Sequence, residues 1–211
     1  MKKGCILCLL ISVISLPLIA QNIIYSNLKE LLTQHGDTTA VLRVEKRSRN
    51  QIVLTGGADY RITAGDDESM CRRLKKRCFA VRDEKGNLYL NCRKLRYKKL
   101  RFGAWYAPAV QLGKNIYFCA MPLGSVIGGN FVEEDDVKLG GNIGDALAAS
   151  SLVTKRVCYE LNGETGKVDF LGKDRMLQLL KNYPELKQAY LKDDSQEAKH
   201  TFKYLLELQN K

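Results

Sequence analysis

Residues 79–92 read FAVRDEKGNLYLNC, and this stretch decides the fold. Two alternating apolar segments flank the turn residues Lys85 and Gly86, a pattern typical of a β-hairpin. The hairpin lies inside a longer stretch, Met70 to Pro122. That stretch also holds two basic runs, CRRLKKRC at 71–78 and RKLRYKKLR at 93–101. We therefore expect the chain to be organised around strands in this region.

The apolar pattern changes parity on both sides of the second basic run. Leu88 and Leu90 share one parity, Leu95 and Tyr97 have the other, and Leu100 returns to the first. A parity change predicts a bulge or bend on each side of residues 93–99. Lysines in this run are also typical of an edge that must not pair with another molecule. The next hairpin, 106–112 with 116–121, contains Pro108, which predicts an edge strand.

Upstream, the sequence predicts a short helix over 26–34, capped by Ser26 or Asn27, and a strand over 39–45 that pairs with 51–55 as a hairpin. A third strand is expected over 60–63. The acidic residues 66–68 then cap a helical turn that extends to Lys76.

Downstream, residues 156–161 and 167–171 predict a hairpin, and helical spacing follows from 172 to the end. The small-residue segment 143–151 predicts a helix that packs closely on the sheet. Together these patterns predict an α+β fold. Its antiparallel β-hairpins form a curved sheet, with a Gly/Ala-rich helix and a C-terminal group of two or three helices packed on it.

The N-terminus has the form of a secretory signal peptide: Lys2 and Lys3 precede an apolar run over 6–16, and cleavage is expected after Ala20. We therefore expect export to the periplasm, the medium or the cell surface, with no membrane span in the mature chain. Residues 21–211 should form one domain: 21–122 mainly β, 123–155 a Gly-rich loop plus helix, 156–171 a hairpin and 172–211 helical.

The basic character is local. Between Arg72 and Arg101 there are 13 Lys or Arg residues against only Asp83 and Glu84, while the whole chain carries a net charge of +11. Such a field favours an anionic partner: a lipid headgroup, an acidic polysaccharide or an acidic protein surface, with no chromosomal nucleic acid expected for an exported chain. In the alternative interpretation, the run is only a solvated sheet edge that neutralises the acidic cluster 133–136. The anion-binding candidates are Arg72, Arg73, Lys75, Lys76, Arg93, Lys94, Arg96, Lys98 and Lys99.

Five cysteines lie outside the leader. Cys78 and Cys92 fall nearly opposite each other in the predicted hairpin and form the candidate disulfide, with two small buried hydrophobes as the alternative. A thiol protein using Cys71 and Cys78 is a weaker hypothesis, because the flanking cations would lower a thiolate pKa. No metal site is expected, since no CxxC occurs and His35 and His200 lie far from any cysteine pair.

An enzyme is the less favoured class, because no catalytic motif is recognisable and no cofactor is implied. A hydrolase that uses a carboxylate pair such as Asp59 and Asp169, brought together by folding, stays an alternative.

Several runs carry a resemblance. They read LRVEKRS at 42–48, GADYR at 57–61, LKKRC at 74–78, NCRKLRY at 91–97, GKDRML at 172–177 and YPEL at 183–186. Over nearly the whole mature chain they resemble a family of exported proteins from Bacteroidetes-type bacteria, known only as a domain of unknown function. The resemblance implies export from a Gram-negative cell, and it implies no activity, cofactor or catalytic residue.

Overall fold

The structure, a computed structural model, describes residues 21–39, 41–123, 125–127, 130–132, 155–193, 195 and 197–211. The expected signal peptide, the acidic cluster 133–136 and the small-residue segment 143–151 lie outside the described residues.

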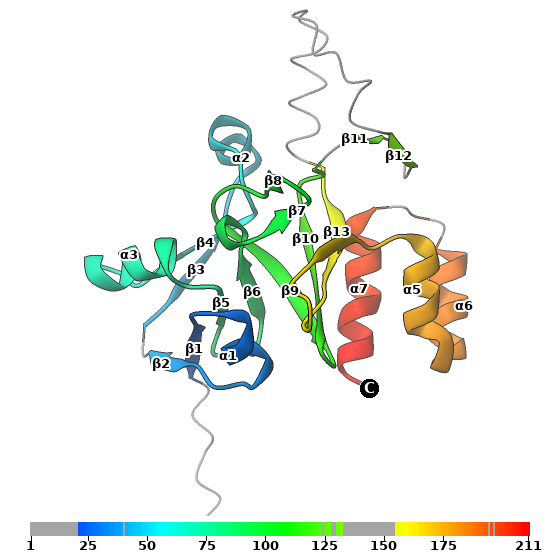
Figure 1. The fold of residues 1–211 in the computed structure, drawn as a ribbon, viewed down its shortest axis with the longest axis horizontal. Coiled ribbons are helices and arrows are strands. Elements are labelled where there is room, and N and C mark those ends of the chain that lie inside the picture. Colours follow the sequence, from blue (N-terminus) through cyan, green and yellow to red (C-terminus); the bar gives the residue numbers. More distant parts are fainter. Residues whose placement is uncertain are drawn as a thin grey trace, which may run out of the picture.

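An antiparallel sheet of ten strands forms the centre of the molecule (Figure 1), with the order β14-β13-β10-β9-β6-β5-β1-β2 and with β3 and β4 joined to β9 through β4. Its strands are β1 (Asn22–Tyr25), β2 (Asp37–Thr39), β3 (Arg43–Lys46), β4 (Tyr60–Thr63), β5 (Ala80–Arg82), β6 (Leu88–Asn91), β9 (Tyr106–Leu112), β10 (Asn115–Ala120), β13 (Val157–Leu161) and β14 (Val168–Phe170). Two small ribbons pair β7 (Arg96–Tyr97) with β8 (Leu100–Arg101) and β11 (Ser125–Ile127) with β12 (Asn130–Val132).

In Figure 1, α3 lies on one side of the molecule beside β4, and α5, α6 and α7 lie on the other side, where α7 packs on β9, β10 and β13. The bounds of the helices are α1 (Leu28–Leu32), α2 (Arg49–Thr55), α3 (Glu68–Lys76), η1 (Cys92–Lys94), α5 (Lys173–Leu179), η2 (Leu180–Asn182), α6 (Pro184–Lys192) and α7 (Ala198–Gln209). The expected α+β class, with antiparallel hairpins and C-terminal helices, is confirmed. No helix in the described part of the chain is long and apolar enough to cross a membrane.

The hairpin predicted from residues 79–92 is present. β5 pairs with β6 in the register Ala80–Leu90, Val81–Tyr89 and Arg82–Leu88. Asp83 closes the turn by accepting the backbone N–H groups of Lys85 and Asn87 at 3.0 and 2.8 Å. These bonds satisfy turn donors that the ladder does not reach, which is why an Asp favours this position.

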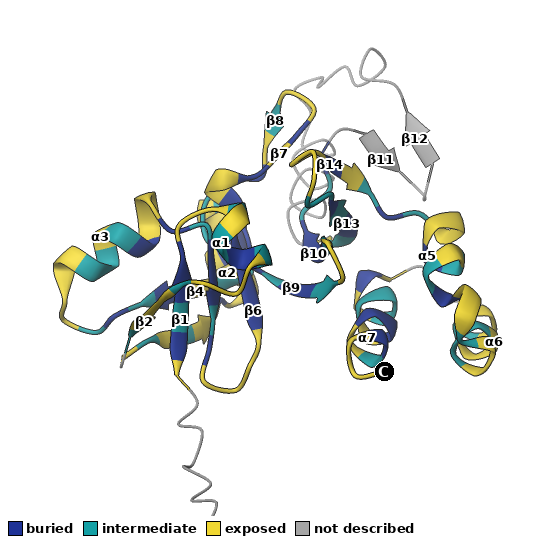
Figure 2. Cartoon of the chain, turned by 60° about the horizontal axis from the view of Figure 1, so that its bottom comes forward, coloured by how far each residue is buried: buried dark blue, intermediate teal, exposed yellow. Residues whose placement is uncertain are grey.

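Alternating side chains send apolar groups to both faces of the sheet. On β9, Tyr106 and Val110 lie on one face, Tyr106 in the cluster beside α3 and Val110 in the cluster beside α7. Ala107 and Ala109 lie on the other face, in the largest cluster, which residues from α1 and from the 92–105 segment cover. Figure 2 shows the buried positions concentrated along the strands and the inner side of α7, while the outer sides of α3 and α6 are exposed.

One predicted strand is a helix. Residues 51–55 belong to α2, and β3 pairs with β4 instead, so the hairpin expected between 39–45 and 51–55 is wrong. Ser48 and Gln51 form a reciprocal capping box, in which each side chain accepts the other residue's backbone N–H. Two satisfied donors at the start of a helix outweigh the strand preference of Ile52 and Val53.

The edge assignment from Pro108 is also wrong, because β9 is a central strand with β6 and β10 as neighbours. Pro108 lies opposite Tyr89 of β6, and the register with β10 ends at Ala109. The proline is therefore placed where the β9–β10 ladder has stopped, and it removes little of the pairing.

The bends expected around the second basic run are present. The chain leaves β6 in the 3₁₀ turn η1, and Lys98 and Lys99 then form the turn of the β7–β8 ribbon. This ribbon is not an edge of the ten-stranded sheet. Lys98 and Lys99 therefore lie in the turn between the two strands of a separate ribbon, and the interpretation of the basic run as a solvated edge stays a prediction.

Candidate anion-binding site

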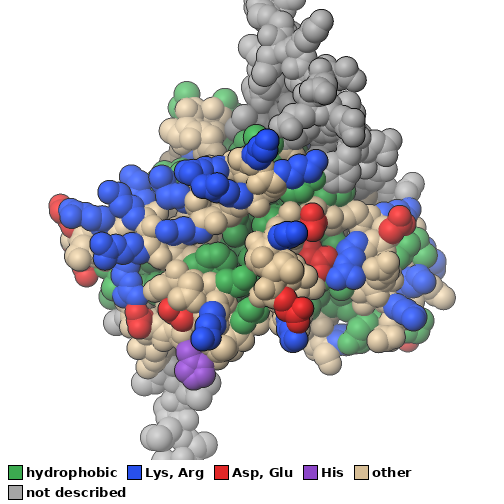
Figure 3. Space-filling model, in the orientation of Figure 1, with side chains coloured by type: hydrophobic (Ala, Val, Ile, Leu, Met, Phe, Trp, Pro, Cys, Tyr) green, Lys and Arg blue, Asp and Glu red, His purple; other side chains and the backbone are tan. Residues whose placement is uncertain are grey.

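The nine predicted anion-binding residues come from three places in the fold. Arg72, Arg73, Lys75 and Lys76 belong to α3, Arg93 and Lys94 to η1, and Arg96, Lys98 and Lys99 to the β7–β8 ribbon. Eight are exposed and Arg73 is half-buried. In the face shown in Figure 3, Lys and Arg side chains gather in the half of the molecule that contains α3 and the β7–β8 ribbon.

Few of these cations are matched by a carboxylate. Within the described residues, Arg73 pairs with Asp37 of β2, and the other eight make no ion pair. Asp37 is exposed in this pair, so the Arg73–Asp37 pair contributes little to stability. The charges of the other eight are therefore not neutralised by ion pairs within the described part of the chain.

The two basic runs meet in one pocket of about 390 Å³. Lys75 reaches it from α3 and Arg93 from η1, while Arg43 and Arg61 reach it from the paired strands β3 and β4. Trp105, which immediately precedes β9, forms part of its wall. The volume is in the range of small-ligand sites.

The register of β3 with β4 explains why Arg43 and Arg61 reach the same pocket. Arg43 lies opposite Thr63 and Arg61 lies opposite Glu45, so the four residues share one face of the β3–β4 pair. None of the four pocket cations makes an ion pair with a carboxylate of the described residues. Glu45 and Asp66 also line the pocket. Four cations against two carboxylates leave it positive.

Trp105 is held in an unusual backbone conformation. Its φ is 76°, in the left-handed region that costs an aromatic residue roughly 1–3 kcal/mol. The backbone on either side is fixed, because Trp105 O accepts the Cys92 N–H and Ala104 O accepts the Ala58 N–H, each at 2.9 Å. A Cβ on Gly57 would lie 2.5 Å from Ala104 O and 2.9 Å from Trp105 Cδ1. Only glycine therefore lets the chain pass under this tryptophan.

Two guanidinium groups lie near the indole. The Cζ atoms of Arg47 and Arg61 are 5.0 and 5.9 Å from the centroid of the Trp105 ring, within the range of cation–π attraction. A second hollow shares Glu45, Arg61 and Trp105 with the first. Trp105 therefore borders both hollows.

Arg47 is a structural cation. It is buried, and its Nη1 donates to Gly56 O and Ala58 O at 2.8 and 2.7 Å, while Nη2 donates to Gln51 O at 2.9 Å and to Thr55 Oγ1. Burial lowers the pKa of Arg47, and the nearby Asp59 carboxylate opposes that shift. These carbonyl contacts hold the α2 loop against Trp105.

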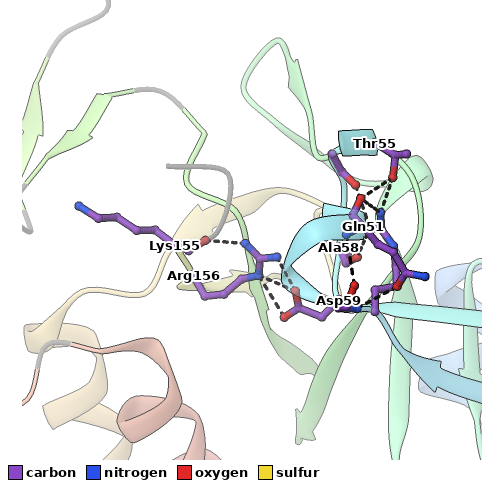
Figure 4. Close-up of polar contacts among 9 residues, drawn as sticks. Gln51, Thr55, Ala58, Asp59, Lys155 and Arg156 are labelled. Atoms are coloured by element: carbon purple, nitrogen blue, oxygen red, sulfur yellow. Dashed lines mark hydrogen bonds and ion pairs between the residues drawn. The ribbon is translucent and has the colours of Figure 1, made fainter. Parts of the chain in front are cut away.

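Asp59 is paired with Arg156 and does not meet Asp169. Figure 4 shows the Arg156 side chain directed at Asp59, with Ala58 on the same loop as Asp59 and with Gln51 and Thr55 on the preceding helix α2. Arg156 Nε donates to the two carboxylate oxygens at 2.8 and 3.0 Å, and Nη2 donates as well. Asp169 is an exposed residue of β14, and it lies opposite Glu160 of β13. The structure therefore gives no carboxylate pair of the kind that the hydrolase alternative needs at these residues.

The structure does not bring the two cysteines of the candidate disulfide together. Cys78 and Cys92 are buried in clusters on opposite faces of the sheet. The β5–β6 register would place them opposite each other, but the chain leaves the ladder at both positions. Asn91 Nδ2 donates to the carbonyl oxygens of Leu74 and Cys78 at 3.1 and 2.9 Å, which fixes the position of Cys78 just after α3.

The lowered thiolate pKa that the thiol hypothesis expects is not found at Cys78. Burial raises the pKa of its thiol to about 11, against the lowering expected from the neighbouring cations. Cys71 differs: it is half-buried, lines the pocket, and its Sγ accepts the Ala64 N–H at 3.3 Å.

The two histidines have local partners. His35 Nδ1 contacts Thr33 O at 2.6 Å, and His200 Nδ1 contacts Asp193 Oδ2 at 2.9 Å. Over the described residues, no three His, Cys, Asp or Glu side chains are grouped so that they could hold a metal ion.

Sequence reasoning found Lys75 and Arg93 but missed Arg43 and Arg61. β3 mixes basic residues with Glu45 and β4 carries a single basic residue, so neither strand stands out as basic, and the two arginines meet through the β3–β4 register. Correct pairing of 43–46 with 60–63 would have supplied the signal.

A family model described as a family of unknown function (DUF6563) matches residues 23–211. The chain therefore belongs to this family, which confirms the resemblance to a domain of unknown function. No curated protein and no solved structure matches the chain.

Proposed function

We propose that this protein is an exported accessory protein that binds an acidic glycan in the pocket between α3, η1, β3 and β4. The observation that carries the proposal is the convergence of Arg43, Arg61, Lys75 and Arg93 on one pocket with no carboxylate partner among the described residues. Export rests on the signal-peptide form of residues 1–20.

A sugar acid fits the mixture of groups in this pocket. Its carboxylate or sulfate would pair with the guanidinium groups, for which arginine is well shaped. Its hydroxyls would donate to Glu45 and Asp66, and the apolar C–H groups of the sugar ring would lie against Trp105. A flat protein surface would not enter a hollow of this volume.

The test is titration of the purified chain with polygalacturonate, a polymer of uronic acid, followed through the fluorescence of Trp105. Neutral dextran is the matched control ligand. We expect polygalacturonate to bind at low ionic strength and to weaken steeply as salt is added, since released counterions drive such association.

Matched variants locate the site. Arg61→Ala and Arg93→Ala should each weaken binding by about tenfold or more, because a hydrogen bond to a charged group contributes about 1.5–3 kcal/mol. Lys98→Ala removes the same charge from the exposed β7–β8 turn and should leave the dissociation constant within about twofold. Equal losses in the three variants would contradict a pocket and favour a diffuse basic surface. Absence of binding at low salt would reject the proposal.

A lipid headgroup is a second candidate, and α2 is the observation that favours it. Leu54 and Val53 of this helix are 82% and 41% exposed, and Gln51 and Thr55 of the same helix line the second hollow. An apolar tip beside a basic pocket is typical of contact with an anionic membrane surface. Co-sedimentation with vesicles of anionic phospholipid, lost in Leu54→Ser and retained in Val41→Ser, would support this candidate over the glycan. Val41 supplies a matched exposed apolar residue outside α2.

A further inference from the structure

The sheet brings together two cysteines that lie 39 residues apart in the sequence. Cys119 of β10 and Cys158 of β13 occupy directly opposed positions in the antiparallel register. Their Sγ atoms are 2.8 Å apart, and both residues are buried, 6% and 3% exposed. Neither is part of the basic pocket.

The backbone hydrogen bonds show that Cys119 and Cys158 do not bond to each other through their main chains. Cys158 O accepts the Leu171 N–H at 2.9 Å, so the backbone polar groups of Cys158 face β14 and not β10. Cys119 and Cys158 are therefore a non-hydrogen-bonded pair, the kind whose Cα atoms are about 4.5 Å apart and whose side chains are closer. A disulfide needs Cα atoms about 4.4–6.8 Å apart, so the backbone already meets the requirement.

We infer that Cys119 and Cys158 form a disulfide that joins β10 to β13. The two thiols lose two protons and two electrons as the S–S bond forms. The electrons pass to a disulfide-carrying thiol oxidant, which leaves as a dithiol after thiol–disulfide exchange. Such oxidants act in the compartments to which an exported chain is delivered.

The position of α7 indicates when the bond would form. Ala198 O, at the first residue of α7, is 3.4 Å from Cys158 Sγ and 3.8 Å from Cys119 Sγ. The helix therefore covers both sulfurs, and oxidation should take place before α7 docks. Once α7 is in place, the bond should resist a small reductant in the native protein and yield to it in denaturant.

Peptide mapping of the full chain tests the inference. The chain is expressed with its own N-terminal segment in an oxidising compartment, its free thiols are blocked in denaturant, and it is digested with trypsin. We expect residues 115–138 and 157–167 to be recovered as one linked product that separates on reduction. Recovery of both peptides singly, each with a blocked cysteine, would overturn the inference, and so would a link from either cysteine to Cys71, Cys78 or Cys92.

A second measurement uses the variants. The oxidised wild-type chain should have a higher Tm than the reduced chain, and Cys119→Ala/Cys158→Ala should abolish that difference. Cys92→Ala is the matched control, because it removes an equally buried cysteine and should retain the linked peptides. If the double variant fails to fold, the mapping of the wild-type chain decides the question alone. A difference in Tm that survives in a folded double variant would contradict the pair.

Discussion

Arg156 lies against Asp59, and its Nε donates to both oxygens of that carboxylate, at 2.8 and 3.0 Å. The two residues are 97 positions apart in the sequence. They join the start of β4 to the start of β13, and their side chains are only 14% and 19% exposed. Four consequences of the structure can be measured, and the first concerns this pair.

Asp59→Asn should lower the free energy of unfolding by about 2 kcal/mol or more, because it leaves a largely buried guanidinium without its carboxylate. Urea denaturation measures the change. Asp37→Asn breaks an ion pair in which Asp37 is 65% exposed, and it should cost less than about 0.5 kcal/mol. Equal effects of the two variants would mean that the Asp59–Arg156 pair has no special structural role.

Gly57→Ala should displace Trp105. The new Cβ meets Ala104 O at 2.5 Å and Trp105 Cδ1 at 2.9 Å, at a φ of +82°. We expect a shift in tryptophan emission, which reports on this site alone because Trp105 is the only tryptophan in the chain. Gly86→Ala is the control: its φ is +84° but its Cβ would meet open space. That variant should lose about 1 kcal/mol and leave the emission unchanged.

Glu160 should make stability depend on acid pH. It accepts from Arg175 Nε and Nη2 at 2.8 Å, from Asn115 Nδ2 at 2.7 Å and from Tyr117 Oη at 3.0 Å. The hydrogen bonds from Arg175 are the largest cause that holds its pKa below the usual 4.5, and burial opposes them. Because the folded pKa is the lower one, the stabilisation is complete above pH 4.5 and is lost as pH falls through the folded value.

Glu160→Gln should therefore flatten the dependence of the free energy of unfolding on pH below about 4.5. Chemical denaturation at a series of acid pH values measures it. Glu164→Gln is the comparison, because Glu164 pairs with Lys114 in the open and salt should screen its contribution. An unchanged pH profile in Glu160→Gln would contradict this assignment.

Cys71 should be the first cysteine of the described residues to react with a thiol reagent in the folded protein. It is half-buried, whereas Cys78, Cys92, Cys119 and Cys158 are buried. Burial also raises the pKa of Cys78 to about 11, which removes its reactive thiolate at neutral pH. Peptide mass spectrometry after brief labelling identifies the site, and polygalacturonate should slow the labelling if it occupies the pocket. Equal labelling of Cys71 and Cys78 would contradict the burial.

Local signals predicted most of the elements. The turn at Lys85–Gly86 and the hairpin at 156–171 are marked by residues that need turn conformations, and both hairpins are present. Asn27 caps α1 and Asp67 caps α3, each by accepting a backbone N–H three residues ahead. Such signals work because the cause and the structure lie within a few residues of each other.

The failures have one local cause and one long-range cause. The Ser48–Gln51 capping box is a local signal for a helix, and a strand prediction that ignores it pairs β3 with residues 51–55 and not with β4. Because β3 was paired with the wrong segment, Arg43 and Arg61 were not among the predicted anion-binding residues. Cys119 and Cys158 share no local pattern, so only the order of β10 and β13 reveals their proximity. The density of charge in the sequence therefore predicted Lys75 and Arg93 in the pocket, whereas Arg43 and Arg61 follow only from the β3–β4 register.

The central place of β9 has a consequence for the order of assembly. This strand pairs with β6, with β10 and, at Tyr60–Tyr106, with β4. A chain that emerges from its N-terminus first leaves β6 and β4 without this neighbour until residues 106–112 are made. In the described ten-stranded sheet, β10, β13 and β14 are connected by pairing to the earlier strands only through β9. The two parts of the sheet that β9 joins should therefore fold together and unfold together, as a single cooperative unit.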